Sequence, residues 1–302
     1  MSARILVPLD GSAFAESALP VALAVGRRSG GAIELVAVQE PAPPFAYEEW
    51  ELASRDWSES YLAEAARRAR EASGVEVTTT VLRGRVADAL ARRTVESDAD
   101  LVVMATHGRG ALTRAWLGSV ADSFVRHTDR PVLLVRPDDE EEQPPDPAGN
   151  WALGHVLIAL DGSDLSRAIV GPAVRLGSLF DARYTLLRVV MFPVELASPY
   201  LPHTVQMNRD VVEEARAAAQ RDLEGLAEEL RGKGLRVEAD VEVDGQAAHA
   251  ILDQARELGA HLIALATHGR GGVTRAVLGS TADKVIRGAH RPVLVLRPPS
   301  AE

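Results

Sequence analysis

Two short motifs, each present twice, hold residue types that could bind a phosphate-bearing ligand. The sequence LDGS occupies residues 9–12 and 160–163, and ATHGRG occupies residues 105–110 and 266–271. Glycines allow the backbone to approach an anion closely and to turn its N–H groups toward it. Four arginines stand within or just after the second motif and add positive charge: Arg109, Arg114, Arg270 and Arg275. This combination predicts a phosphate cradle.

A Gly-Ser pair follows each ATHGRG motif, at residues 118–119 and 279–280. Amphipathic stretches begin at both pairs, so we expect Ser119 and Ser280 to cap helices. The N-terminus of a helix attracts negative charge, which strengthens the expectation of a phosphate site.

Structural interpretations of the same residues stay open. Glycine-containing loops with a serine cap are common in α/β domains, and Asp-Gly-Ser after a strand is also typical of a turn that leads into a helix. The arginines could simply be solvated. His107 and His268 each lack a second ligand or an acidic partner at a recognisable spacing. We therefore favour loop roles for them, predict no catalytic residue and leave a metal site open.

An internal repeat organises the chain. Residues 106–137 and 267–298 match at 20 of 32 positions without a gap, at an offset of 161, whereas the two LDGS motifs are offset by 151. The second copy therefore carries ten extra residues, for which the proline-containing stretch 191–208 is the obvious place. A period of this length indicates a duplicated domain, because solenoid repeats are much shorter.

Short apolar runs alternate with amphipathic stretches within each copy. Strands are expected at 5–9, 33–38, 75–82, 101–105 and 132–135, and again at 156–160, 184–190, 235–241, 262–266 and 293–296. Helices are expected in the first copy at 13–28, 56–72, 86–96 and 119–127. The strands are aliphatic and unbroken, as in parallel sheets covered on both faces. The fold class is therefore α/β: two tandem doubly wound domains, each a five-stranded parallel sheet with helices on both faces.

The common strand order 3-2-1-4-5 would place the first and fourth strands side by side. Ligands bind such sheets outside the carboxyl ends of the strands, where the winding direction reverses. LDGS ends the first strand and ATHGRG follows the fourth, so both motifs are expected to converge on one crevice in each domain.

Composition fits two water-soluble domains, at residues 1–137 and 151–302 of the 302-residue chain. Between them, residues 138–150 hold six acids, no base and several prolines, which predicts an extended linker. The net charge of −10 and the lack of a basic face argue against nucleic-acid binding. No apolar stretch suits a membrane span. The absence of cysteine fits a reducing compartment, so the cytoplasm is the expected location.

Both copies resemble the universal stress protein domain. Its ATP-binding members carry the pattern Gly, two residues, Gly, nine residues, Gly, then Ser or Thr. The spacing is kept here from Ala105 through Gly108 to Gly118 and from Ala266 through Gly269 to Gly279, with alanine in place of the first glycine. The resemblance covers nearly the whole chain apart from the linker and the loops after each second strand, and it is specific because LDGS, the glycine motif and RPVL occur in the same order twice.

The resemblance implies one ATP site per domain, and it leaves an accompanying Mg²⁺ open. Aspartates 10 and 161 would contact the adenosine part, valines 38 and 189 the adenine, and the Gly-Ser pairs the phosphates. The implied residues of the first copy are Pro8, Leu9, Asp10, Val38, Met104, Ala105, His107, Gly108, Arg109, Gly118, Ser119 and Val120. Those of the second copy are Ala159, Leu160, Asp161, Val189, Leu265, Ala266, His268, Gly269, Arg270, Gly279, Ser280 and Thr281.

The resemblance also implies pairing through the last strand of each domain, because family members dimerise there. The tandem chain is thus expected to form an intramolecular pseudo-dimer through residues 132–135 and 293–296, and a homodimer of two chains stays open. The favoured function is a nucleotide-dependent regulatory protein of the stress response. The alternatives are a slow ATP hydrolase, although the chain has no GxxxxGK[ST] motif, and a nucleotide-free interaction module.

Overall fold

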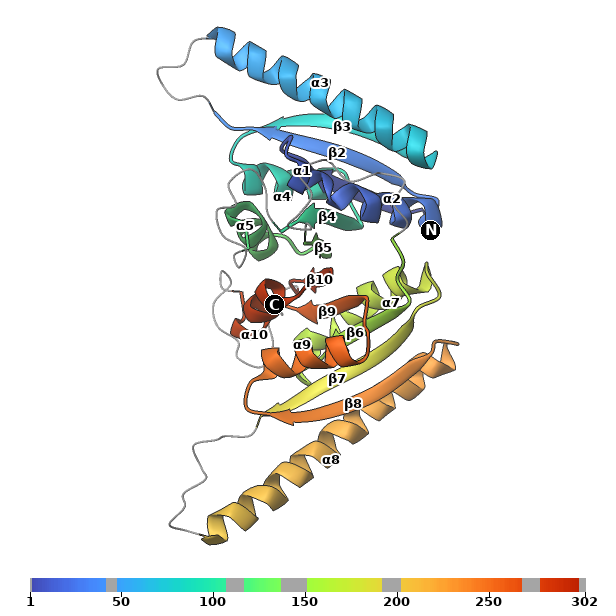
Figure 1. Cartoon of the computed structure of the whole chain (residues 1–302), viewed down its shortest axis with the longest axis vertical. Helices are drawn as coiled ribbons and strands as arrows, with labels where there is room; N and C mark the ends of the chain where they lie inside the picture. The colour runs from blue at the N-terminus through green and yellow to red at the C-terminus, as the bar shows by residue number, and fades with distance from the viewer. Residues whose placement is uncertain are drawn as a thin grey trace. The chain divides into compact units, whose positions relative to one another are not determined.

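The computed structural model describes residues 2–41, 48–106, 117–136, 151–191, 202–267 and 278–298 (Figure 1). The described residues form two compact units. One unit holds the residues up to Ala152 together with those from His290 onward, and the other holds those from Leu153 to Ala289.

The first unit is a doubly wound α/β fold. Its strands are β1 (Arg4–Pro8), β2 (Ala32–Gln39), β3 (Glu76–Arg83), β4 (Leu101–Ala105) and β5 (Val132–Val135). Its helices are α1 (Ala13–Glu16), α2 (Ala18–Ser29), α3 (Glu48–Ser73), α4 (Val86–Glu96) and α5 (Ser119–His127). The five strands are parallel in the order β3-β2-β1-β4-β5, so the predicted order 3-2-1-4-5 is confirmed.

Helices cover both faces of this sheet. Neighbouring residues of a strand point to opposite faces. Ile33 of β2 lies under Gly26 of α2, whereas the adjacent Glu34 forms an ion pair with Arg93 of α4. Consequently α2 and α4 lie on opposite faces, as a doubly wound topology requires.

The second unit repeats this arrangement. Its elements are β6 (His155–Ala159), α6 (Asp164–Arg167), α7 (Val170–Ser178), β7 (Arg183–Met191), α8 (Pro202–Gly232), β8 (Val237–Asp244), α9 (Ala247–Glu257), β9 (Leu262–Ala266) and α10 (Ser280–Gly288). Its strands are parallel in the order β8-β7-β6-β9, which is the same 3-2-1-4 pattern. The α8 helix begins inside the stretch where the ten extra residues were expected.

The last strands of the two repeats, which were expected to pair, lie next to each other. Strand β10 (Val293–Leu296) belongs to the first unit and runs antiparallel to β5, with Leu294 opposite Leu133. Both strands are entirely buried. An apolar edge strand exposes unpaired N–H and C=O groups, and pairing satisfies them.

The first predicted helix, over 13–28, is in fact two helices. It breaks at Ser17, whose N–H and hydroxyl both donate to the carbonyl of Phe14. The reason is Pro20, which has no N–H to donate to residue 16 and so fits only the first turn of a new helix. Pro172 stands at the same third position of α7. Helix α3 also differs, because it begins at Glu48, eight residues before the predicted start.

The linker predicted at 138–150 lies outside the described residues. None of the described helices combines the length and the apolar character that crossing a membrane requires.

A buried histidine sits at the start of β6. His155 is buried, and its ring nitrogens lie 3.2 Å from the carbonyl oxygen of Leu258 and 2.9 Å from Oγ1 of Thr185. Burial lowers the pKa of His155, and the nearby charge of Arg183 lowers it further. The folded chain therefore resists protonation at this site.

We expect this histidine to make stability pH-dependent. The unfolded chain binds a proton near the ordinary histidine pKa of about 6.5, and the folded chain does so only at lower pH. The stability of the second unit should therefore fall as the pH drops below about 6.5. Urea midpoints between pH 7.5 and 5 would measure this effect, and His155→Gln should reduce the slope. An unchanged slope in that variant would show that other groups cause it.

Candidate functional site

The carboxyl ends of β1 and β4 lie side by side, as do those of β6 and β9. Ile5 pairs with Leu101 in the first unit and Val156 pairs with Leu262 in the second. The LDGS motif follows β1 and β6, and the first residue of ATHGRG is the last residue of β4 and of β9. The structure therefore brings together, at one edge of each sheet, the beginnings of both motifs.

The Asp-Gly-Ser turn has the same geometry in both halves. In the first, Oδ1 of Asp10 accepts hydrogen bonds from the backbone N–H and the hydroxyl of Ser12, at 2.9 and 2.6 Å. In the second, Asp161 and Ser163 form the same two bonds at the same distances. The intervening glycines have positive φ values of 84° and 82°, which favour glycine.

The serine of each turn also caps the following helix. The hydroxyl of Ser12 accepts from the N–H of Ala15, and that of Ser163 accepts from the N–H of Ser166, both at 3.1 Å. The structural interpretation of Asp-Gly-Ser as a turn and helix cap is therefore confirmed. It leaves the aspartate carboxylates just beyond the carboxyl ends of β1 and β6.

The expected serine caps at the second motif are wrong by one residue. The caps of α5 and α10 are Gly118 and Gly279, and neither uses a side chain. Both glycines have extended backbone, so Ser119 and Ser280 become the first helical residues. Both serines are exposed, and Val120 and Thr281 follow them in the first turn. The first N–H groups of a helix have no partner inside the helix and so remain available to an anion.

A backbone hydrogen bond holds each helix start against the end of the fourth strand. The N–H of Gly118 donates to the carbonyl of Thr106 at 2.8 Å, and that of Gly279 donates to the carbonyl of Thr267 at 2.9 Å. A Cβ at residue 279 would lie 2.7 Å from the Thr267 oxygen. Only glycine permits this approach, so the fold brings the N-terminus of α10 to the edge where Asp161 lies.

The remaining described site residues line the strand ends. Six of these residues lie at or next to the ends of the first and fourth strands, and all six are buried: Leu9, Met104, Ala105, Ala159, Leu160 and Leu265. Pro8 is opposite Val36 in the β1–β2 register, so Val38 lies further along β2 toward its carboxyl end. Val189 has the same place in β7, opposite Glu242 of β8. Ala266 ends β9.

Some predicted residues fall outside the described part of the chain, namely His107, Gly108, Arg109, His268, Gly269 and Arg270. Among the described residues, no group of three or more His, Asp or Glu side chains could hold a metal ion. The described groups that suit a nucleotide are backbone N–H groups and hydroxyls as donors and the two aspartates as acceptors.

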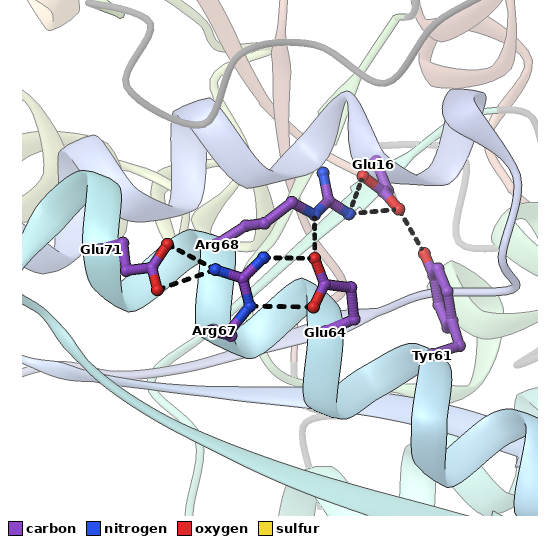
Figure 2. Close-up of polar contacts among 6 residues, drawn as sticks. All are labelled: Glu16, Tyr61, Glu64, Arg67, Arg68 and Glu71. Carbon is purple, nitrogen blue, oxygen red and sulfur yellow. Dashed lines mark hydrogen bonds and ion pairs between the residues drawn. The ribbon is translucent and has the colours of Figure 1, made fainter.

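Sequence reasoning missed a cluster beside the first turn. Glu16, the last residue of α1, accepts hydrogen bonds from Tyr61 and Arg68 of α3 (Figure 2). Burial raises the pKa of Tyr61, and the negative charges of Glu16 and Asp10 raise it further. The sequence signal that could have revealed this cluster was Glu16 itself, a charged residue whose neighbours in the sequence are mostly apolar.

The second half has an arginine that the first half lacks. The guanidinium of Arg188 on β7 lies directly against the backbone of Gly162, where a Cβ would come within 2.5 Å of it. Nη1 of Arg188 also lies 3.4 Å from Oδ2 of Asp222 on α8. At the repeat offset of 151, the corresponding residue of the first half is Ala37. A comparison of the copies could have identified this difference.

Comparisons with known proteins point in one direction. The model of the universal stress protein family matches twice, at residues 1–136 and 153–297. The universal stress protein Rv2005c of Mycobacterium tuberculosis is 30% identical over 258 residues, which cover 84% of this chain and 82% of the relative. Another protein from that organism, the universal stress protein Rv1996, is 27% identical over 315 residues, covering 98% and 95% of the two chains.

A solved structure agrees in fold. The crystal structure of a universal stress protein from Archaeoglobus fulgidus superimposes with a TM-score of 0.72 at 20% identity, covering 99% of this chain and 97% of that one.

Proposed function

Because the chain belongs to the universal stress protein family, we propose that each of its halves binds an adenine nucleotide, with ATP as the principal ligand, and that occupancy regulates its role in the stress response. The observation that carries this proposal is the glycine-closed helix start. In both halves, a Gly N–H bonded to the end of the fourth strand brings a helix N-terminus to the edge where the aspartate of LDGS lies.

The chemistry of the described donors fits such a ligand. The N–H groups of the first turns of α5 and α10, with the hydroxyls of Ser119 and Ser280, suit phosphate oxygens. Asp10 and Asp161, as hydrogen-bond acceptors, suit ribose hydroxyls. ATP would supply its own triphosphate for Mg²⁺, and the protein contribution would be positioning of the nucleotide.

A second part of the proposal concerns the assembly of the two halves and the limits of the two domains. We propose that the chain is an intramolecular pseudo-dimer of two domains, 1–137 and 151–302, joined by the acidic linker 138–150 and working in the cytoplasm. The antiparallel pairing of β10 with β5 supports the pseudo-dimer. The lack of cysteine supports a reducing compartment.

Thermal unfolding of the nucleotide-stripped chain tests the function. A ligand that binds only the folded state adds about 2.7 kcal/mol of stability at a concentration of 100 times its Kd. We expect the unfolding temperature to rise with ATP and Mg²⁺, to rise less with AMP, and to stay unchanged with GTP. An unfolding temperature that none of the three nucleotides changes would refute the proposed function. Equal stabilisation by ATP and GTP would refute adenine recognition alone.

A further inference from the structure

In each half an ion pair joins a short helix to a long helix, and the positive and negative partners are exchanged between the two halves. In the first half, the docking contact joins Glu16 of α1 to Arg68 of α3. Nη2 of Arg68 lies 2.8 and 3.0 Å from the two carboxylate oxygens of Glu16, and the hydroxyl of Tyr61 donates to Oε1 at 2.9 Å (Figure 2). The Glu16 side chain is only 4% exposed, and that of Arg68 is 29% exposed. The negative partner is thus on the short helix and the positive partner on the long one.

Equivalent residues of the second half follow from matching contacts. Ser12 and Ser163 both cap and are 151 residues apart, so Glu16 corresponds to Arg167. Both Glu16 and Arg167 also donate their backbone N–H to the carbonyl of the capping serine. Both short helices therefore present these side chains from the same position.

The long helices align at an offset of 161. Arg70 of α3 donates from Nε to the carbonyl of Val77, at 3.0 Å, and Arg231 of α8 makes the same bond to Val237 at 2.8 Å. Buried pairs at the same offset are Leu62 with Leu223, Ala66 with Ala227 and Ala69 with Leu230. Tyr61 therefore corresponds to Asp222, and Arg68 corresponds to Glu229.

The polarity in the second half is the reverse of that in the first. Arg167 of α6 forms an ion pair with Asp222 of α8, and Asp222 also pairs with Arg188. Lys233 lowers the pKa of Glu229, and the positive charge of Arg167 contributes in the same direction. Here the short helix is positive and the long helix is negative.

We propose that this charge reversal makes each long helix dock only on its own half of the chain. The halves share one fold, so α3 and α8 have similar apolar faces and could exchange during folding, within one chain or between two copies. Misassembly of this kind is a characteristic failure of repeated domains. After an exchange, Arg68 would face Arg167, and Asp222 and Glu229 would face the buried Glu16. Like charges at close range repel, and a buried carboxylate without its partner is strongly unfavourable.

A variant with equalised charges tests the proposal. The triple variant E16R/Y61D/R68E gives the first half the pattern of the second, so each half keeps an internal ion pair while discrimination is lost. Because residue 16 is nearly buried whereas Arg167 is 42% exposed, the unfolding midpoint of this variant should lie below that of the wild type, and refolding is therefore compared after complete removal of urea. On refolding from urea, it should yield a several-fold larger fraction of oligomeric or non-native chain by size-exclusion chromatography. The fraction of oligomer should grow with protein concentration.

The matched control reverses an exposed pair on the same helix. Arg55 and Glu59 of α3 form an ion pair in which both side chains are about half exposed. The variant R55E/E59R should refold as the wild type does. If the triple variant does not reach the native state, the double variant E16R/R68E, which keeps Tyr61, takes its place with the same measurement. Refolding yields of the reversed variant equal to those of the wild type and the control would overturn the proposal.

Discussion

Replacing Gly279 with alanine is expected to weaken ATP binding in the second half and to leave the first half able to bind. The new Cβ would lie 2.7 Å from the carbonyl oxygen of Thr267, a backbone atom that cannot turn aside. The helix start must then move, and the hydrogen bond from residue 279 to Thr267 is lost or stretched. Overpacking of this kind costs about 1–3 kcal/mol. If that cost falls on the bound geometry, affinity at this site drops on the order of 10- to 100-fold.

Equilibrium dialysis with labelled ATP would measure this loss. Gly225→Ala is the matched control, because Gly225 lies within α8 and a Cβ there meets no atom within 4 Å. Alanine in the interior of a helix is favourable, so the control should bind like the wild type. Gly118→Ala should weaken the other site in the same way, since Gly118 forms the same bond to Thr106 and has nearly the same backbone angles as Gly279. Unchanged binding by a folded Gly279→Ala protein would show that the start of α10 does not hold phosphate.

The second large effect is expected from Arg68→Met. The substitution keeps the apolar stem but leaves Glu16, whose side chain is 4% exposed, without its cationic partner. Removing one member of a buried ion pair typically costs about 3–5 kcal/mol, and the partial exposure of Arg68 favours the lower end of that range. With a urea m-value of about 2 kcal/mol per molar, the unfolding midpoint of the first unit should fall by roughly 1–2 M.

Arg67→Met, a substitution of the residue before Arg68, is the control for Arg68→Met. The guanidinium of Arg67 forms ion pairs with Glu64 and Glu71, but all three side chains are more than half exposed (Figure 2). Exposed ion pairs contribute little, so Arg67→Met should leave the midpoint nearly unchanged. Circular dichroism during urea titration would follow both variants. If both variants lowered the midpoint equally, the buried position of Glu16 would not be the cause.

The sequence predicted some strands and some helices to the residue, since the helices expected at 86–96 and 119–127 match α4 and α5. Residues 101–105 and 132–135 are uninterrupted aliphatic runs, and the predicted limits match β4 and β5. The predicted helix over 13–28 missed the break at Ser17, although Pro20 signals it. The start of α3 was missed although Trp50, Ala53 and Trp57 recur at helical spacing in its first turns.

The sequence predicted the parts of the site that belong to the repeated motifs and missed the parts outside them. The LDGS and Gly-Ser pairs identified residues that the fold brings to the same edge, because parallel strands place their carboxyl ends together. The clusters around Glu16 and Arg188 depend on side chains from helices and strands far apart in the sequence. No local pattern predicts such contacts, and comparing the two copies residue by residue is what reveals them.

Isothermal titration of the nucleotide-stripped chain with ATP and Mg²⁺ is the most direct test of two nucleotide sites. The wild type should bind two equivalents of ATP per chain. The single variants Gly118→Ala and Gly279→Ala should each bind one equivalent with high affinity, and the double variant should bind ATP only with an affinity on the order of 10- to 100-fold lower. Absence of ATP binding by the folded wild-type chain, or two equivalents bound by the double variant with wild-type affinity, would contradict the account.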